Sequence, residues 1–320
     1  MSFKRNVWLA AVLSCALSAP AAAQLNPSRN ITLVVPIGAG GGVDAVGRLV
    51  AEKLQERLKI NVVVENRTGA GGTVGTDSVA KAAPDGHTLL LIESSAAISK
   101  WLNKGVPFDV TADFAPIARV ATSPLMLFAH PSVAAKDAKD MIALAKSSQL
   151  TVAIPGVGTP HHLANVLFNS AAKIDITVVP YRGTGPGLAD VLAGRVPLMW
   201  ATPVALIPHV ESGKVNALAV ASLKRASSLP QAATIAESAL PGFEVEIWFG
   251  VAAPAKTPPA IVAQLSKEIE AIMALPDVKE RTAKFGLDIA YAGSEPFRKL
   301  IADDYARFGK AVQAAGIKAE

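Results

Sequence analysis

The sequence predicts an α/β protein of two lobes, each a mixed sheet flanked by helices, with a ligand cleft between the lobes. Apolar, strand-like runs alternate with amphipathic, helix-like stretches along most of the chain. A chain of 320 residues is longer than one hydrophobic core usually supports. The order apolar strand, proline, glycine-rich loop and helix occurs twice, in residues 31–44 and 150–162. Two such halves predict glycine-rich loops that face each other across the cleft.

The first 23 residues predict a cleaved signal peptide. Residues 1–5 are basic, residues 7–17 are mostly apolar but too short to span a bilayer, and Ala21–Ala23 provide a small-residue cleavage site before Gln24. Cys15 is the only cysteine. An alternative to cleavage before Gln24 is a lipid anchor on Cys15. In either case the rest of the chain can form neither a disulfide nor a thiolate metal site.

Composition argues against several classes of function. The net charge of +5 is spread over lysines and arginines that alternate with acids, and no basic tract or aromatic stripe indicates nucleic-acid binding. His161 and His162 are adjacent, so they point in different directions on a helix, and no carboxylate stands at ligand spacing. No G-x-S-x-G motif or obvious carboxylate pair is present. We therefore expect no enzyme activity, no metal and no cofactor.

The first lobe begins with the glycine-rich unit. We predict strands at 31–35, 61–65 and 88–93. The first helix opens near Asp44, and its apolar residues recur at helical spacing: Val46, Leu49, Val50, Leu54 and Leu58. Asp44 and Glu93 could meet at the edge of the sheet, but we prefer Asp44 as a helix cap. A second glycine-rich turn, residues 69–72, precedes a helix that ends near Pro84.

The second lobe repeats this alternation and the chain then returns. We predict extended segments at 117–122, 125–129, 150–154, 176–181, 196–202, 216–222 and 242–252, and helices at 136–147, 258–274, 276–285 and 294–315. With a crossing near Ser123 and Pro124, lobe 1 comprises residues 24–123 and 252–320, and lobe 2 comprises residues 124–251.

The glycine-rich loops predict an anion site. Glycines at a helix N-terminus let an anion approach unsatisfied backbone N–H groups. The alternative is a turn that only closes a βα unit. Residues 38–43 lack the last glycine of a dinucleotide fingerprint and the ending of a Walker loop. Arg182 is the side chain best suited to a carboxylate, unless it is a surface residue. Tyr181 and Trp200 could form apolar walls or pack in the core.

Seven ordered blocks resemble the Bug family, the periplasmic substrate-binding proteins of tripartite tricarboxylate transporters. These blocks are Val35–Asp44, Val64–Thr73, Ala83–Leu90, Phe108–Pro116, Gly158–Leu163, Val179–Gly183 and Leu240–Val245. The resemblance implies a two-domain, type II-like periplasmic binding protein fold and a location in the periplasm. It also implies hinge closure on a small organic carboxylate and delivery to integral-membrane permease subunits. We expect a monomer.

The resemblance also implies a set of ligand-binding residues. The loops matching 36–44 and 156–162 hold the carboxylate ends, and the segments matching 181–183 and 201–202 complete the pocket. With the serines that follow the third strand, the candidates are Ile37, Gly38, Ala39, Gly40, Gly41, Asp44, Ser94, Ser95, Gly158, Thr159, His161, His162, Tyr181, Arg182, Gly183, Ala201 and Thr202.

Three positions depart from the family pattern. Ile37 stands where phenylalanine is common, and Ala201 and Thr202 stand where Asp-Asn is common. Without that acid the pocket lacks an acceptor for an ammonium group, so we expect a dicarboxylate, a tricarboxylate or an aromatic carboxylate rather than an amino acid. Two alternatives remain: a ligand-sensing protein that presents its closed form to a signalling partner, and an exported hydrolase.

Overall fold

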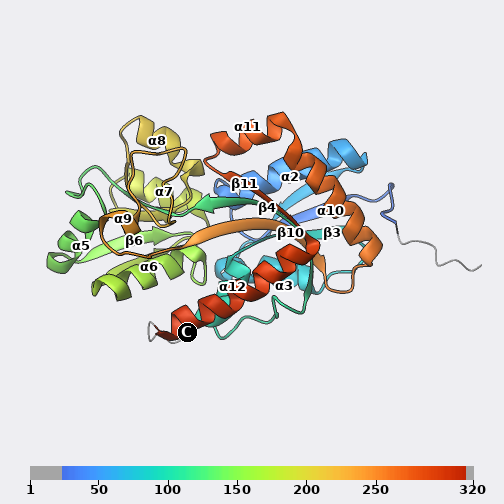
Figure 1. The fold of residues 1–320 in the computed structure, drawn as a ribbon, viewed down its shortest axis with the longest axis horizontal. Coiled ribbons are helices and arrows are strands. Elements are labelled where there is room, and N and C mark those ends of the chain that lie inside the picture. Colours follow the sequence, from blue (N-terminus) through green and yellow to red (C-terminus); the bar gives the residue numbers. More distant parts are fainter. Residues whose placement is uncertain (1–23, 315–320) are drawn as a thin grey trace, which may run out of the picture.

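The computed structural model describes residues 24–314, so the predicted signal peptide and Cys15 lie outside the described residues. The chain forms two mixed sheets flanked by helices, which lie side by side (Figure 1). The first sheet has the order β11 (Asp288–Gly293), β4 (Phe114–Pro124), β10 (Glu246–Pro254), β3 (Thr88–Glu93), β1 (Ile31–Val35) and β2 (Val62–Asn66). The second has the order β7 (Ile176–Pro180), β6 (Leu150–Ile154), β8 (Leu198–Ala201), β5 (Met126–Ala129) and β9 (Asn216–Val220). The predicted α/β fold of two mixed sheets is confirmed.

Each sheet contains a parallel half and an antiparallel half. In the first sheet β1 lies between the parallel strands β2 and β3, and in the second β6 lies between the parallel strands β7 and β8. The helix after β1, α2 (Gly42–Leu58), and the helix after β6, α6 (Pro160–Ala172), therefore begin at the same kind of position. Ligands of such sheets gather where neighbouring connections leave in opposite directions, beyond the carboxyl ends of the strands.

The first sheet buries both of its faces. Along β1, Leu33 and Val35 pack in a cluster with α2 and α10 (Pro259–Ala274), while Val34 packs in the opposite cluster. The opposite face is covered by α3 (Thr73–Ala80), α4 (Ser95–Leu102) and α12 (Ser294–Ala314). Alternate residues of a strand point to opposite faces, so a strand covered on both sides is apolar throughout.

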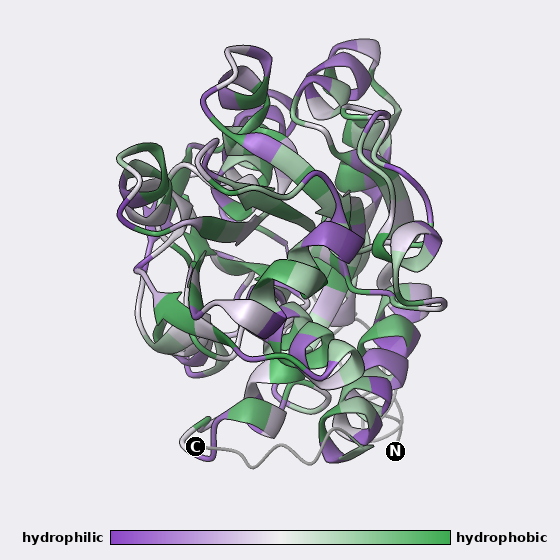
Figure 2. Cartoon of the chain, turned by 90° about the vertical axis from the view of Figure 1, so that its left-hand side faces the viewer, coloured by the Kyte–Doolittle hydropathy of each residue, from purple (hydrophilic) through white to green (hydrophobic). Residues whose placement is uncertain are grey.

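The second sheet is covered in the same way. One face packs against α5 (Ala138–Ser147) and α6, and the other against α7 (Thr184–Leu192) and α8 (Ile207–Glu211). The remaining helices are α9 (Ile235–Ser238), α11 (Pro276–Lys284) and the short 3-10 turns η1 (Ala70–Gly72) and η2 (Pro203–Ala205). In Figure 2 the helices carry both hydrophilic (purple) and hydrophobic (green) residues, and the strands between them are mostly hydrophobic.

The helix α2 confirms the pattern predicted for it. Val46, Leu49, Val50 and Leu54 are all buried, and Leu58 packs at the margin of the same cluster. Lys59 ends the helix in a left-handed conformation. Within residues 24–314, no helix combines the length and the apolar character needed to cross a membrane.

The chain passes between the sheets at two places. It leaves β4 at Pro124 and enters β5 at Met126, and it returns through β10, which pairs with β3 and β4 from Glu246 onward. The chain has therefore rejoined the first sheet by Glu246, whereas the sequence places the boundary between lobe 2 and lobe 1 at residue 252. The division into lobes, as bodies that move, stays a prediction.

One strand was missed because we expected the C-terminal region to be helical. β11 pairs antiparallel with β4, and the Arg119 Nε donates a hydrogen bond of 2.7 Å to the Ala290 carbonyl. The segment contains Tyr291 and Ile289 but lies between two helices, so no alternation of its own marks it clearly.

Candidate functional site

Glycines from the two sheets meet directly. A Cβ on Gly38, in the loop after β1, would overlap the Arg182 carbonyl oxygen, and a Cβ on Gly183 would lie 3.1 Å from the Gly38 Cα. Likewise, a Cβ on Gly71 would overlap the Val157 carbonyl oxygen, and a Cβ on Gly156 would lie 3.0 Å from the Gly71 Cα. Only residues without a side chain allow two backbones to approach this closely. The structure is therefore a closed form.

A narrow cavity lies between these contacts. The cavity has a volume of about 10 Å³, which is room for about one water molecule. Its walls come from both sheets and from the strand that joins them: Ile37, Gly41, Gly42, Val43, Glu93, Pro155, Thr159, His161, Thr184, Thr202, Ile247 and Phe249. This space is smaller than a small organic acid such as a dicarboxylate.

Five predicted site residues line this cavity. They are Ile37, Gly41, Thr159, His161 and Thr202. A neighbouring recess is lined by other predicted residues, namely Gly38, Tyr181, Arg182 and Gly183, together with the second glycine-rich turn.

The other predicted residues lie outside the cavity walls. Ala39 and Gly40 are exposed, and Ala201 packs in the apolar core of the second sheet. Gly158 approaches Ser99, and its N–H donates to the His162 Nδ1 at 3.3 Å.

Asp44 does not cap the helix, so that prediction was wrong. The N-cap of α2 is Gly41, which has no side-chain cap, and Asp44 stands in the first turn. Its carboxylate accepts hydrogen bonds from the Arg48 Nε at 3.0 Å and the Asn66 Nδ2 at 3.0 Å. Burial opposes ionisation, but these hydrogen bonds hold the pKa of Asp44 below its ordinary value. Its oxygens are engaged within the first sheet, so it organises the glycine loop and does not line the cavity.

The side chains of Tyr181 and Arg182 point to other partners or to solvent. The Tyr181 hydroxyl donates to the Asp190 carboxylate at 2.7 Å, and burial together with this bond raises the pKa of Tyr181 to about 12. Arg182 is exposed, and it is its backbone carbonyl that contacts Gly38. Trp200 is fully buried and packs against Phe168, so it belongs to the core.

Two helices begin at the cavity without a side-chain cap. α2 starts after Gly41 and α7 after Gly183, and neither glycine offers a side-chain acceptor. The first turns of these helices, 17 and 9 residues long, contribute Gly42, Val43 and Thr184 to the cavity walls. Such N-termini carry partial positive charge and unsatisfied donors, the arrangement that favours an anion.

The ionisable residues among the cavity walls are Glu93 and His161. Glu93 is 2% exposed, and burial raises the pKa of its carboxyl to about 7. His161 is 6% exposed, and burial lowers the pKa of its imidazole to about 3. The Glu93 Oε2 and the His161 Nδ1 have no hydrogen-bond partner in the described chain. Within residues 24–314, no group of three or more potential side-chain ligands could hold a metal.

Seven of the wall residues are absent from the predicted set. Gly42 and Val43 lie within the predicted loop 36–44, Pro155 and Thr184 adjoin predicted loop residues, and Glu93 was predicted only as a possible neighbour of Asp44. Ile247 and Phe249 come from β10, where Phe249 stands opposite Glu93 in the sheet. No local signal marks these residues, because β10 reads as an ordinary apolar strand.

Residues 46–317 match the family model described as the tripartite tricarboxylate transporter family receptor. The chain belongs to this receptor family. The resemblance to Bug proteins is confirmed by BugT of Bordetella pertussis, which is 35% identical over 96% of this chain and 95% of its own length.

Solved receptor structures share the fold. The periplasmic binding protein BugD has a TM-score of 0.88 at 33% identity, covering 92% of this chain and 100% of its own. A protein of R. palustris solved with adipate has a TM-score of 0.88 at 31% identity, covering 92% and 99%. MatC from Rhodopseudomonas palustris, with bound malate, has a TM-score of 0.83 at 32% identity, covering 90% and 100%.

Proposed function

We propose that this receptor captures a small organic carboxylate between its two lobes and delivers it to the permease subunits of a tripartite tricarboxylate transporter. The observation that carries the proposal is that two helices without a side-chain cap, α2 and α7, begin at the walls of one cavity and come from different lobes. Solved relatives of the same fold hold adipate and malate, both of which carry two carboxylates. Two anionic ends match two positive helix ends.

Capture requires the lobes to open and close. The cavity has room for about one water, and loops of the two lobes touch beside it at Gly38 and Gly71, so a solute needs these contacts to separate. A solute that bridges the lobes touches both of them only when they close around it, so it shifts the population toward a closed, liganded form, in which the cavity is wider than the space for about one water described above. We propose that the ligand-binding residues are those of the cavity and the adjoining recess, and that the moving bodies are lobes divided near Pro124 and β10. No bond is made or broken in this cycle.

A thermal-shift screen followed by calorimetry tests the carboxylate assignment. Purified protein is screened against monocarboxylates, dicarboxylates, tricarboxylates and aromatic acids, with their neutral methyl esters as matched controls. A ligand at 100 times its dissociation constant stabilises the folded state by about 2.7 kcal/mol. Acids that raise the melting temperature while their esters do not support the proposal. An equal response to acids and esters, or no response, overturns it.

The export step has its own test. Mass spectrometry of the protein recovered from a cell envelope should give a mature chain that begins at Gln24, with no lipid on it. A lipid-modified chain that begins at Cys15 would instead identify an anchored receptor.

A further inference from the structure

Glu93 is an acid in a pocket that we expect to receive acids. It ends β3 beneath the cavity and is 2% exposed. Ser95, at the start of α4, stabilises the ionised carboxylate of Glu93 through its side chain and its backbone, which limits the rise in pKa caused by burial. The Glu93 Oε2 itself has no hydrogen-bond partner in the described chain. The free oxygen belongs to a residue that lines the cavity.

A buried polar atom without a partner is unfavourable, and native structures retain few of them. This cavity has two, the Glu93 Oε2 and the His161 Nδ1. No lysine or arginine is among the cavity walls described above to neutralise the glutamate. Burial raises the pKa of Glu93 to about 7, and the contacts with Ser95 at the N-terminus of the eight-residue helix α4 limit this rise, so the ionised carboxylate is populated near neutral pH. An ionised carboxylate accepts hydrogen bonds and cannot donate them.

We infer that Glu93 is a specificity-determining residue, and that it accepts a hydrogen bond from an ammonium or amide N–H carried by the captured carboxylate. The inference rests on the proposed function. The solute would place its carboxylate ends at α2 and α7 and its nitrogen at the Glu93 Oε2. This revises the expectation drawn from Ala201 and Thr202, because the acid absent from the second sheet is supplied by the first.

Pairs of solutes with the same carbon skeleton test this inference. They are glutarate and glutamate, adipate and 2-aminoadipate, and succinate and aspartate. Titration calorimetry should show the nitrogen-bearing member binding at least about tenfold more tightly in at least one pair, the effect expected of a hydrogen bond to a charged group. Glu93→Gln keeps the shape and removes the charge, so it should reduce the preference for an ammonium to less than about threefold. Glu295→Gln, at the exposed start of α12, is the matched control and should leave the preference unchanged.

Proton linkage in the wild-type protein gives a second readout that does not depend on a variant folding. Glu93 and His161 are the titratable groups facing the cavity; the walls from α2, α7, β8 and β10 contribute none. An ammonium bound to Glu93 requires the ionised carboxylate, so binding at pH 6 should release a proton, measured in two buffers of different ionisation enthalpy. Proton uptake would mean that a protonated Glu93 donates to the solute, which overturns the inference.

The remaining outcomes separate the two proposals. If plain dicarboxylates bind as tightly as their nitrogen-bearing partners in every pair, or if Glu93→Gln leaves the preference intact, the inference fails and the proposed function stands. If no carboxylate of either kind binds, both fail.

Discussion

At the scale of single residues, burial decides which groups of this receptor can change charge. Glu93 and His161 line one cavity, yet desolvation moves their pKa values in opposite directions, to about 7 and about 3. Both groups are therefore biased toward their neutral forms in the closed, ligand-free protein. Asp44, also buried, stays ionised because Arg48 and Asn66 donate to it. Two buried carboxyl groups, Glu93 and Asp44, thus differ in charge because they differ in the hydrogen bonds they accept.

The raised pKa of Glu93 predicts a pH dependence of stability. An unfolded glutamate titrates near 4.5 and the folded one near 7, so between these values only the folded state holds the proton. The contribution of Glu93 to the free energy of unfolding is therefore complete below about pH 4.5 and is lost as the pH rises through about 7. Relative to wild type, Glu93→Gln should gain up to about 3 kcal/mol in the free energy of unfolding between pH 4.5 and 8.

Urea denaturation of the ligand-free protein at several pH values measures this gain. His161 acts in the opposite sense, since its contribution is present above about pH 6.5 and is lost as the pH falls toward 3. The difference between wild type and variant at each pH removes the His161 effect. Glu295→Gln again serves as the control. Wild-type and Glu93→Gln profiles that stay parallel across this range would contradict the assignment.

At the scale of elements, the glycine loops matter because their residues have no side chain. The positions of these loops were predictable, because strand, proline, glycines and helix follow one another in consecutive residues. The loops after β1 and β6 and the turn at η1 were all identified from sequence. What could not be predicted is which glycines approach the backbone of the other lobe, namely Gly38 with Gly183 and Gly71 with Gly156.

Gly38→Ala should weaken binding by at least about tenfold while changing the melting temperature of the free protein little. Its backbone is not in the left-handed region, so alanine causes no local strain there, but the new methyl would overlap the Arg182 carbonyl in the closed form alone. Calorimetry measures the affinity. Gly293→Ala is the control, since its methyl would meet no atom closer than 3.5 Å. Equal affinities for the two variants would show that closure does not require this contact.

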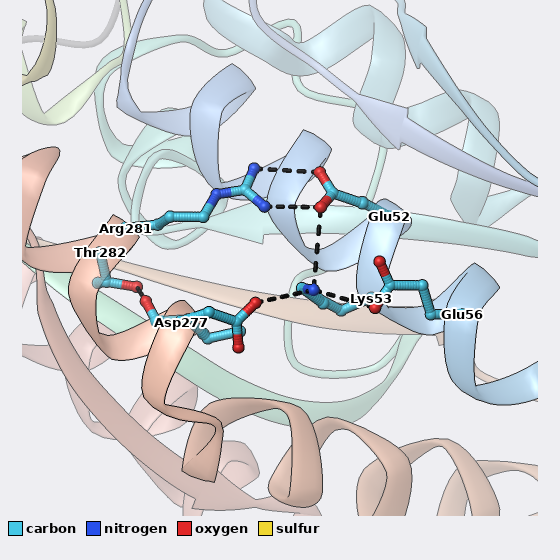
Figure 3. A network of polar contacts seen from close by, with 7 residues as sticks. Glu52, Lys53, Glu56, Asp277, Arg281 and Thr282 are labelled. Atoms are coloured by element: carbon cyan, nitrogen blue, oxygen red, sulfur yellow. Dashed lines mark hydrogen bonds and ion pairs between the residues drawn. The ribbon is translucent and has the colours of Figure 1, made fainter.

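A network of charged side chains joins α2 to α11 (Figure 3). The Lys53 Nζ lies 2.8 Å from Asp277 and 3.0 Å from Glu56, and Arg281 binds Glu52 with both terminal nitrogens. The hydrogen bond from Lys53 lowers the pKa of Asp277, and the one from Arg281 lowers the pKa of Glu52. Several mutually positioned charges hold a helix pair better than isolated surface pairs do.

Lys53→Met should lower the melting temperature by a few degrees, and the loss should shrink in 1 M salt, where charges are screened over about 3 Å. Differential scanning calorimetry at low and high salt measures both effects. Lys299→Met is the control, because Lys299 pairs only with Asp303 on the exposed side of α12. A loss that is independent of salt would indicate packing by the aliphatic stem of Lys53 instead.

At the scale of the whole molecule, two sheets are connected by two passages of the chain and share one cavity. The cavity has room for about one water, so the proposed capture of a larger solute predicts that the receptor also populates an open form. We expect small-angle scattering to give a larger radius of gyration for the free protein than for the protein with a bound carboxylate. The compaction should be reduced in Gly38→Ala at the same ligand concentration. A radius that does not change on binding would contradict hinge closure.

The sequence by itself determined the α/β class, the two repeats of strand, glycine loop and helix, and the membership of the receptor family. These depend on periodicity and turn chemistry within short windows, which the chain carries locally. The tertiary structure alone decided that Asp44 is bound by Arg48 and Asn66, that β11 completes the first sheet, and that Glu93 faces His161 across one cavity. These contacts depend on the pairing of distant strands and on the approach of two lobes. They join residues that are far apart in the chain, so no short stretch of the sequence indicates them.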